Sequence, residues 1–392
     1  MKIVIFTDAY PPFINGVATS TYNLVQSLRA HEHEVLVVAP KAVNGPTEIV
    51  DGTIYMSGIE LKNFYGYRLT QIYSSKVYKM VKNFKPDLMH IQTDFTVGQF
   101  GKICARKLKK IPSVYTYHTA YEDYTHYVTH GMADRFVKKF VRSYSKNYAK
   151  TVTEYITPSE KTMNYLRSAG SDVHVNIVPT GLDFSLFQNR DGVEEKIKEF
   201  KKEHNIDEDT KVILLLGRIA AEKSMDVSIR GFHAFRTMYP DFKCKLLVVG
   251  DGPQKAELQQ MVYDLKEEDF VEFLGKKNAS EVPFYYQLAD MYTSASITET
   301  QGLTFMESMA SGTIVLARFD VQLSETIIDE ETGYFFSDLD SFATQTYKIL
   351  TLSDQDKQLI VENAYKFVDK YSIDKFYENI MRVYKRAVRK KW

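Results

Sequence analysis

The sequence has few cysteines and no apolar run long enough to cross a bilayer. Its 392 residues include only Cys104 and Cys244, and neither has a partner at metal-ligand spacing. Two distant thiols favour buried free cysteines in a reducing compartment over a disulfide. The longest apolar runs, such as residues 212–216, have the length of buried strands. They are well short of the roughly 20 residues of a transmembrane helix.

The N-terminus also lacks the features of a targeting segment. Residues 1–8 enter a predicted strand directly, without an n-region, a long apolar stretch or a small-residue cleavage site. We therefore expect no signal peptide and a cytoplasmic location.

Net charge is zero, but the charges are unevenly distributed. Residues 1–187 carry 22 Lys and Arg against 15 Asp and Glu, whereas residues 188–392 carry 28 against 35. A basic half favours an anionic membrane surface or nucleic acid as partner. The acidic half argues against a long nucleic-acid groove that crosses both halves.

The length favours two domains of similar size. Apolar strands alternate with helical stretches, and the alternation restarts near residue 211, after the charged, helix-prone residues 188–209. The predicted strands are 3–6, 35–39, 88–91, 114–117, 211–216, 245–249, 271–273, 291–294 and 314–317. Such alternation is typical of doubly wound parallel sheets, so we expect an α/β protein with two Rossmann-like domains.

The last stretch, residues 376–392, is helix-like and strongly basic toward its end. Its basic residues are Arg382, Lys385, Arg386, Arg389, Lys390 and Lys391. Composition alone leaves two alternatives, a helix packed on the rest of the chain and a frayed, solvated terminus.

The most informative motif is residues 299–307, in which Glu299 and Glu307 bracket Gly302. The motif follows a predicted strand at 291–294 and leads into a predicted helix at 305–310. A strand, a glycine turn and a helix start present free backbone N–H groups to an anion such as a diphosphate. The alternative is that both acids are ordinary surface residues.

Five motifs in order give the chain a resemblance to a known family. Residues 15–17, 178–183, 217–223, 249–253 and 299–307 resemble the retaining glycosyltransferases of family 4. The resemblance implies the GT-B fold, in which two Rossmann-like doubly wound domains face a central cleft and the C-terminal helix crosses back to the N-terminal domain.

The resemblance also implies a division of labour among three segments. Residues 1–187 would form an acceptor and membrane-binding domain, and residues 188–375 would form the domain that binds the nucleotide-sugar donor. Residues 376–392 would form the basic helix that packs on the N-terminal domain. One departure is that Thr313 follows Gly312, where many family members have proline.

The residues implied in donor binding are Gly16, Arg218, Lys223, Gly302, Leu303 and Glu307. By resemblance, Glu307 would accept hydrogen bonds from the ribose. Arg218 and Lys223 follow a strand, at the end where open α/β sheets bind ligands. Fixed cations there stabilise a departing diphosphate without a metal. We therefore expect no metal cofactor, and we interpret Asp338-Leu339-Asp340 as a loop outside any metal site.

Two residues are implied in catalysis, Glu299 and His118. Glu299 would bind a hydroxyl of the donor hexose, and His118 would bind a donor hydroxyl or assist proton movement. No protein nucleophile is implied, because the donor's own phosphate would accept the proton of the acceptor. The alternative for His118 is a strand-end histidine held by a backbone partner.

Residues 134–148 combine an apolar stripe at helical spacing with five basic residues. The basic residues are Arg135, Lys138, Lys139, Arg142 and Lys146. Such a helix can lie on an anionic bilayer, and each Lys or Arg contributes on the order of 1 kcal/mol. The alternative is an ordinary amphipathic helix packed on its own sheet. Residues 113–127 just before it resemble bacterial enzymes that glucosylate diacylglycerol, and Tyr121, Tyr124 and Tyr127 would suit an interfacial entrance.

The resemblance thus implies a metal-independent, retaining hexosyltransferase, a 1,2-diacylglycerol 3-glucosyltransferase. It would move glucose from UDP-glucose to diacylglycerol or a glycosyl-diacylglycerol at the cytoplasmic membrane face, with no nucleic-acid partner. Alternatives are another lipid acceptor, for example phosphatidylinositol with GDP-mannose, a soluble acceptor, or a catalytically silent membrane-surface binding protein.

Overall fold

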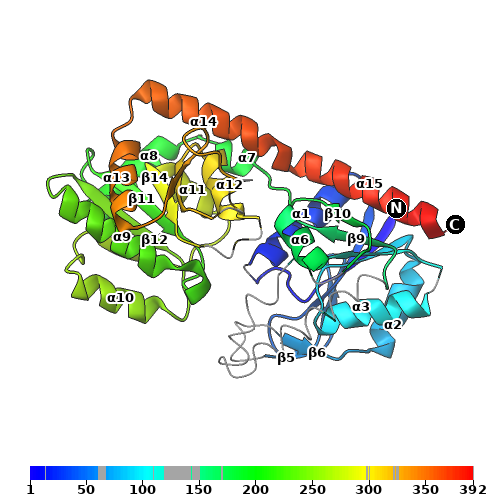
Figure 1. The fold of residues 1–392 in the computed structure, drawn as a ribbon. Coiled ribbons are helices and arrows are strands. Elements are labelled where there is room, and N and C mark those ends of the chain that lie inside the picture. The colour runs from blue at the N-terminus through cyan, green and yellow to red at the C-terminus, as the bar shows by residue number, and fades with distance from the viewer. Residues whose placement is uncertain are drawn as a thin grey trace. The chain divides into compact units, whose positions relative to one another are not determined.

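The computed structural model describes residues 1–13, 15–60, 68–108, 110–118, 143, 151–168, 171–296, 299, 301–320, 323 and 326–391. The chain divides into two compact units, which we call the N-terminal unit (residues 1–182 and 371–392) and the C-terminal unit (residues 183–370) (Figure 1). These division points differ by a few residues from the predicted boundaries near 187 and 375.

The N-terminal unit is built on a mainly parallel sheet. Its strands are β1 (Lys2–Phe6), β2 (Glu34–Pro40), β3 (Glu48–Val50), β4 (Thr53–Met56), β5 (Gly58–Glu60), β6 (Arg68–Thr70), β7 (Leu88–Ile91), β8 (Ser113–Thr116), β9 (Glu154–Thr157) and β10 (Val175–Ile177). Its helices are α1 (Gly16–Ala30), α2 (Ser75–Phe84), α3 (Thr96–Lys107), α6 (Glu160–Ser168) and α15 (Ile373–Lys391). The strand order is β10-β9-β8-β7-β1-β2-β4-β3, and β5 and β6 form a separate antiparallel pair.

The C-terminal unit repeats the same plan. Its strands are β11 (Lys211–Leu216), β12 (Cys244–Val249), β13 (Val271–Gly275), β14 (Met291–Ser294), β15 (Ile314–Arg318) and β16 (Tyr334–Phe336). Its helices are α7 (Ser185–Gln188), α8 (Val193–Glu203), α9 (Met225–Met238), α10 (Lys255–Asp264), α11 (Val282–Leu288), α12 (Leu303–Ala310), α13 (Leu339–Leu350) and α14 (Asp354–Val368), with 3₁₀ turns η2 (Ala221–Lys223) and η4 (Asp369–Tyr371). The strand order is β13-β12-β11-β14-β15-β16, all parallel.

Each sheet contains a point at which the chain reverses its direction of winding. In the N-terminal unit this point lies between β1 and β7, and in the C-terminal unit it lies between β11 and β14. In open parallel sheets, ligands bind beside the carboxyl ends of the strands at such a point. The topology therefore marks one candidate position in each unit.

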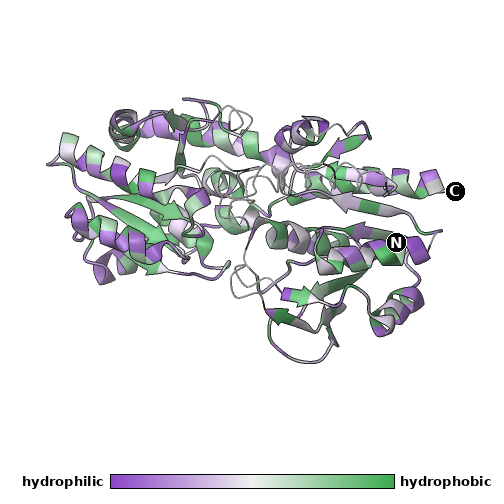
Figure 2. Cartoon of the chain, turned by 60° about the horizontal axis from the view of Figure 1, so that its bottom comes forward, coloured by the Kyte–Doolittle hydropathy of each residue, from purple (hydrophilic) through white to green (hydrophobic). Residues whose placement is uncertain are grey.

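The central strands are apolar on both faces, because helices cover both faces of a parallel sheet. Val212, Ile213, Leu214 and Leu215 of β11 are all at most 1% exposed. Colouring by hydropathy shows mostly apolar strands inside each unit and helices that mix apolar and polar residues around them (Figure 2). Each apolar side chain buried in this way contributes about 1.5–3 kcal/mol.

The C-terminal helix α15 belongs to the N-terminal unit, as predicted. Phe376, Ile380 and Tyr384 recur at helical spacing and join one buried cluster with residues of α1, including Leu24 and Leu28. α15 and α1 lie side by side (Figure 1). The apolar stripe explains why this helix packs rather than frays despite its basic end.

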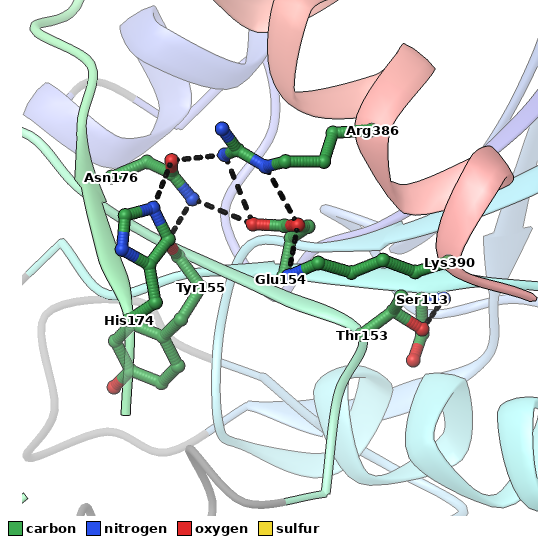
Figure 3. Close-up of polar contacts among 8 residues, drawn as sticks. All are labelled: Ser113, Thr153, Glu154, Tyr155, His174, Asn176, Arg386 and Lys390. Carbon is green, nitrogen blue, oxygen red and sulfur yellow. Dashed lines mark hydrogen bonds and ion pairs between the residues drawn. The ribbon is translucent and has the colours of Figure 1, made fainter. Parts of the chain in front are cut away.

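A polar cluster fastens the end of α15 to strands β9 and β10 (Figure 3). The carboxylate of Glu154 lies 2.8 Å from both Arg386 Nε and Lys390 Nζ, and Asn176 Nδ2 donates to it at 2.9 Å. Burial opposes the charged form of Glu154, but the hydrogen bonds from Arg386, Lys390 and Asn176 outweigh burial and lower its pKa to about 2. Glu154 thus stays ionised and holds both cations of the helix.

Candidate active site

The predicted donor residues of the C-terminal unit gather beside the carboxyl ends of β11 and β14, the neighbouring strands of the winding switch. Arg218 and Lys223 lie in the segment after β11, and Glu299 lies in the segment after β14. Ser296 Oγ donates to the carbonyl of Glu222 at 3.2 Å and so links the two segments. The sheet topology therefore brings together residues that are 76 positions apart.

Lys223 and Glu299 form a direct ion pair. Lys223 Nζ lies 2.5 Å from Glu299 Oε1, and the two side chains are 27% and 14% exposed. Partial burial strengthens the attraction relative to an exposed pair. The sequence predicted both residues as functional, and the structure shows that they contact each other.

Arg218 is held by a residue that the sequence interpretation did not single out. Its guanidinium pairs with the carboxylate of Glu222, whose side chain is only 3% exposed. The two residues are four positions apart within the Gly217–Lys223 motif. Because a planar guanidinium binds a carboxylate in a fixed geometry, Glu222 orients Arg218 from the buried side.

Gly250, the first residue after β12, lets its loop pack closely on the loop after β11. Gly250 has a φ of 147°, and a Cβ there would lie 1.9 Å from the carbonyl oxygen of Gly217. A side chain at this position would push Gly217 and the Arg218 that follows it. The Gly250-Asp251-Gly252 motif therefore supports the backbone of the neighbouring loop.

Gly302 and Leu303 lie at the start of α12, as predicted. Gly302 is the N-cap residue with a φ of 72°, a left-handed conformation that favours glycine, and Leu303 is the first helical residue. Among the described residues, no side-chain hydrogen bond caps the start of α12. The first N–H groups of a helix have no partner within the helix, so they can face an anion.

Glu307 lies inside α12 and is partly buried. Tyr286 of α11 donates its hydroxyl to Glu307 Oε2 at 3.0 Å. Burial raises the pKa of Glu307 to about 7, against the lowering effects of Tyr286 and Lys223. This carboxyl therefore changes its charge near neutral pH.

The departure at Thr313 has a structural counterpart in this network. Thr313 Oγ1 donates to the carbonyl of Tyr286 at 2.5 Å, and its backbone N–H donates to the carbonyl of Ser308 at 3.0 Å. Proline at this position would make neither bond. Thr313 thus helps to fix Tyr286, which in turn binds Glu307.

In the N-terminal unit, His118 follows β8 and bonds to a side chain. His118 Nε2 lies 2.6 Å from Gln92 Oε1, and Gln92 directly follows β7. Burial lowers the pKa of His118 to about 4, so the imidazole is neutral at physiological pH. The alternative for His118 was a histidine held by a backbone partner. At Nε2 the partner is instead the side chain of Gln92.

Gly16 is the first residue of α1 rather than part of a tight turn. Asn15 is the N-cap residue, and its Oδ1 accepts from the backbone N–H of Ala18 at 2.9 Å. The helix begins after β1, one of the two strands at the winding switch of this unit. Gly16 therefore lies at a helix start.

Arg135, Lys138, Lys139, Arg142 and Lys146 lie outside the described residues, as do Tyr121, Tyr124 and Tyr127. Among the helices described, none combines the length and the apolar content that crossing a bilayer requires.

Asp338 has a structural role at the start of α13. It is the N-cap of this helix and forms a capping box with Ser341, whose backbone N–H donates to Asp338 Oδ1 at 2.7 Å. Within the described parts of the chain, no group of three or more His, Cys, Asp or Glu side chains is placed to hold a metal ion. Metal independence stays a prediction.

The sequence interpretation missed the residues that support the predicted ones. These supporting residues are Glu222, Tyr286, Gln92 and His90. Glu222 lies within a recognised motif, so its charge could have been paired with Arg218 four residues before it. The other three lie outside the motifs, and only the folded chain brings them to the site.

Models of two protein families match the chain. Residues 14–186 match the model described as Glycosyltransferase Family 4, and residues 196–367 match the model described as Glycosyl transferases group 1. Each match spans most of one unit.

The chain is also similar to curated relatives and to solved structures. Alpha-monoglucosyldiacylglycerol synthase of Acholeplasma laidlawii is 34% identical over 343 residues, 86% of this chain and 85% of the relative. The protein of the same name from Streptococcus pneumoniae is 33% identical over 390 residues, 97% of this chain and 87% of the relative. The structure of Anabaena HepE in complex with UDP and glucose superposes with a TM-score of 0.75 at 16% identity, covering 97% of this chain and 98% of that one.

The sequence relatives match over most of both chains, and the structural neighbour shares the paired Rossmann-like units of the GT-B fold. The chain therefore belongs to the family 4 glycosyltransferases and is a hexosyltransferase of the GT-B fold.

Proposed function

We propose that this protein transfers glucose from UDP-glucose to diacylglycerol, or to a glycosyl-diacylglycerol, with retention of the anomeric configuration and without a metal. Two relatives that are 34% and 33% identical over most of the chain are named alpha-monoglucosyldiacylglycerol synthase, which supports the sugar and the acceptor. The solved complexes of HepE with UDP and glucose and with UDP-glucose support the donor.

The observation that carries the proposal is the arrangement of Lys223, Glu299 and Glu307 beside the carboxyl ends of β11 and β14. A nucleotide sugar presents a ribose, a diphosphate and a hexose, and this edge offers a matching group for each. Glu307 accepts from the ribose hydroxyls, Arg218 and Lys223 face the diphosphate, and Glu299 accepts from a hexose hydroxyl. The diphosphate also meets the free N–H groups at the start of α12.

In this proposal, retention results from attack on the face that the nucleoside diphosphate leaves, and Glu299 does not act as a nucleophile. Its carboxylate is ion-paired with Lys223 at 2.5 Å, which makes it a poor nucleophile. The acceptor hydroxyl attacks the anomeric carbon on the face that the nucleoside diphosphate leaves, and the departing phosphate oxygen takes its proton. Arg218 and Lys223 stabilise the charge that develops on the diphosphate, the role that a metal has in other transferases.

The proposed site of action is the cytoplasmic face of the membrane, to which the five basic residues from Arg135 to Lys146 would bind. The charge distribution supports a basic N-terminal unit. Residues 1–182 and 371–392 carry 29 Lys and Arg against 16 Asp and Glu, whereas residues 183–370 carry 21 against 34. Including α15 in the N-terminal unit therefore enlarges the charge difference between the two halves.

The test is to incubate the purified protein with EDTA, anionic vesicles containing diacylglycerol, and UDP-glucose, UDP-galactose or GDP-mannose in turn. Mass spectrometry identifies the glycolipid, and the NMR coupling of the anomeric proton reports its configuration. An α-glucosyl-diacylglycerol from UDP-glucose alone is the expected product. A β-linked product would overturn retention, and dependence on an added metal would overturn metal independence.

The membrane part of the proposal has its own test. Binding to vesicles rich in anionic lipid should weaken as salt rises, and replacement of Lys138, Lys139 and Arg142 by Gln should reduce it. The matched control replaces Lys198, Lys201 and Lys202 of α8, a basic set in the acidic unit. Equal binding to neutral vesicles, insensitive to salt, would remove the electrostatic argument.

A further inference from the structure

A buried histidine lies between the C-terminal helix and the site of the N-terminal unit. His90 of β7 is fully buried, and its Nδ1 forms a 2.7 Å hydrogen bond with the hydroxyl of Tyr384 on α15. Its Nε2 forms a 2.7 Å hydrogen bond with Thr116 Oγ1 on β8. Burial lowers the pKa of His90 to about 3, so the ring is neutral. Two hydroxyls therefore occupy the in-plane positions of both ring nitrogens.

The side-chain amide of Gln92 lies against the face of this ring. Gln92 Nε2 is 3.2 Å from both His90 Nδ1 and His90 Nε2. A point equally far from both nitrogens at that distance lies above the ring, because in the ring plane it would clash with Cε1. The face of an aromatic ring is electron-rich, so it attracts the NH₂ group of the amide and repels its oxygen.

The orientation of the Gln92 amide determines the protonation of His118. With its NH₂ group on His90, Gln92 presents Oε1 to His118 Nε2 at 2.6 Å. An amide oxygen only accepts hydrogen bonds, so His118 Nε2 must carry the proton. The other ring nitrogen, Nδ1, then has a lone pair that can accept a hydrogen bond from a substrate hydroxyl.

We propose that Gln92 is a positioning residue that holds His118 in its Nε2-protonated tautomer, and that Tyr384 of the C-terminal helix holds this arrangement through His90. The proposal rests on the proposed function only where it gives His118 a part in transfer. The tautomer itself is a property of the N-terminal unit and can be measured without substrate.

The packing of α15 makes it suited to this role. Arg386 and Lys390, which follow Tyr384 on the same helix, pair with the buried Glu154 (Figure 3). The rings of Tyr384 and His90 also meet edge to face, with centroids 5.5 Å apart. The ion pairs and the apolar stripe together fix the position of the Tyr384 hydroxyl, so the last helix does more than cover the sheet.

The first experiment records NMR spectra of the full chain with ¹⁵N-labelled histidine, with the His118 signal assigned from a His118→Asn variant. We expect the wild-type His118 to be protonated at Nε2. In Gln92→Met, a change of similar volume, His118 should become a mixture of tautomers, whereas its pKa should stay low because the ring stays buried. A wild-type His118 protonated at Nδ1, or a Gln92→Met variant with the wild-type tautomer, would overturn the proposal.

Gln92→Glu keeps the test valid if Gln92→Met does not fold. A carboxylate at this position would stabilise the charged imidazole, so the pKa of His118 should rise by more than one unit. An unchanged pKa in a folded Gln92→Glu variant contradicts a direct bond between the two side chains.

The second experiment measures transfer and nucleotide binding in Tyr384→Phe, with Tyr377→Phe as the matched control. Both variants lose one tyrosine hydroxyl from α15, but Tyr377 binds His33 at 3.0 Å and lies outside the network of His90. We expect kcat to fall a few-fold in Tyr384→Phe and about tenfold in Gln92→Met, with unchanged nucleotide affinity, and no loss in Tyr377→Phe. Equal kcat values in Tyr384→Phe and Tyr377→Phe would remove the helix from the proposal. A wild-type protein without transfer activity would instead refute the proposed function and leave the NMR result standing.

Discussion

The two units have the same sheet plan, but they hold their candidate residues in different ways. In the C-terminal unit, Lys223 pairs with Glu299 and Arg218 pairs with Glu222, all within two motif-bearing loops. In the N-terminal unit, His118 depends on Gln92, which lies against a histidine that the C-terminal helix binds from 294 residues away. Two sheets with a similar strand order can therefore hold a site in different ways. One uses contacts between neighbouring loops, and the other uses contacts with a helix far away in the sequence.

The difference has a chemical counterpart. The C-terminal unit gathers charged groups, which suit a charged donor and a departing diphosphate. The N-terminal network consists of neutral groups, because burial lowers the pKa values of His90 and His118 and so keeps both rings uncharged. Neutral donors and acceptors suit the hydroxyl groups of a sugar or an acceptor.

The largest expected effect is in the C-terminal unit. Glu299→Ala should lower kcat by roughly a thousandfold or more while nucleotide affinity stays nearly unchanged, because the carboxylate contacts the hexose. Lys223→Ala should lower both kcat and nucleotide affinity, since it removes a cation that faces the diphosphate. Steady-state kinetics and calorimetry with UDP measure the two effects. Lys243→Ala, which breaks an exposed ion pair with Asp209, is the control, and full activity of Glu299→Ala would refute the donor site.

In the N-terminal unit, His118→Ala should lower kcat on the order of a hundredfold. Nucleotide affinity should stay within about twofold, because the charged residues proposed to bind nucleotide, Arg218, Lys223 and Glu307, lie in the other unit. Single-turnover kinetics with saturating donor separate the chemical step from binding. An effect on affinity larger than that on kcat would reverse the contrast between the units.

Glu154→Ala should destabilise the N-terminal unit by about 2 kcal/mol, because two cations lose a buried partner. The pKa of Glu154 is lowered to about 2, so its contribution is present above the unfolded value near 4.5 and is lost as pH falls toward 2. Urea unfolding at pH 7 and pH 3 measures the difference between variant and wild type. The difference should be smaller at pH 3, and a constant difference would contradict the electrostatic origin.

The smallest expected effect is a pH dependence in the C-terminal unit. Because the pKa of Glu307 is raised to about 7, nucleotide affinity should increase by up to about tenfold from pH 6 to pH 8, as the ionised form accepts the ribose hydroxyls. The same raised pKa lowers the free energy of unfolding as pH rises from about 4.5 to 7, since the folded state binds the proton more tightly. Glu307→Gln should flatten both profiles, whereas Glu257→Gln on the exposed face of α10 should leave them unchanged.

Much of the fold could be predicted because buried parallel strands consist of consecutive apolar residues, which are easy to recognise in a sequence. The runs at β1, β7, β11, β12 and β14 coincide with predicted strands, since both faces of such a strand are covered. The short strands β3, β4, β5, β6, β9, β10 and β16 were not predicted. Each of them has only three or four residues, few for a period or a run to stand out.

Patterns in the sequence were enough to predict the family, the two-unit architecture and the residues of the C-terminal motifs. These follow from local patterns, namely apolar runs, glycines at loop positions and acids at fixed spacing. Tertiary packing, by contrast, was needed to show that Lys223 meets Glu299, that Glu222 holds Arg218, and that Tyr384 of α15 binds His90. The sequence around each of these residues does not indicate its partner. The reason is that side chains far apart along the chain meet only when strands and helices pack.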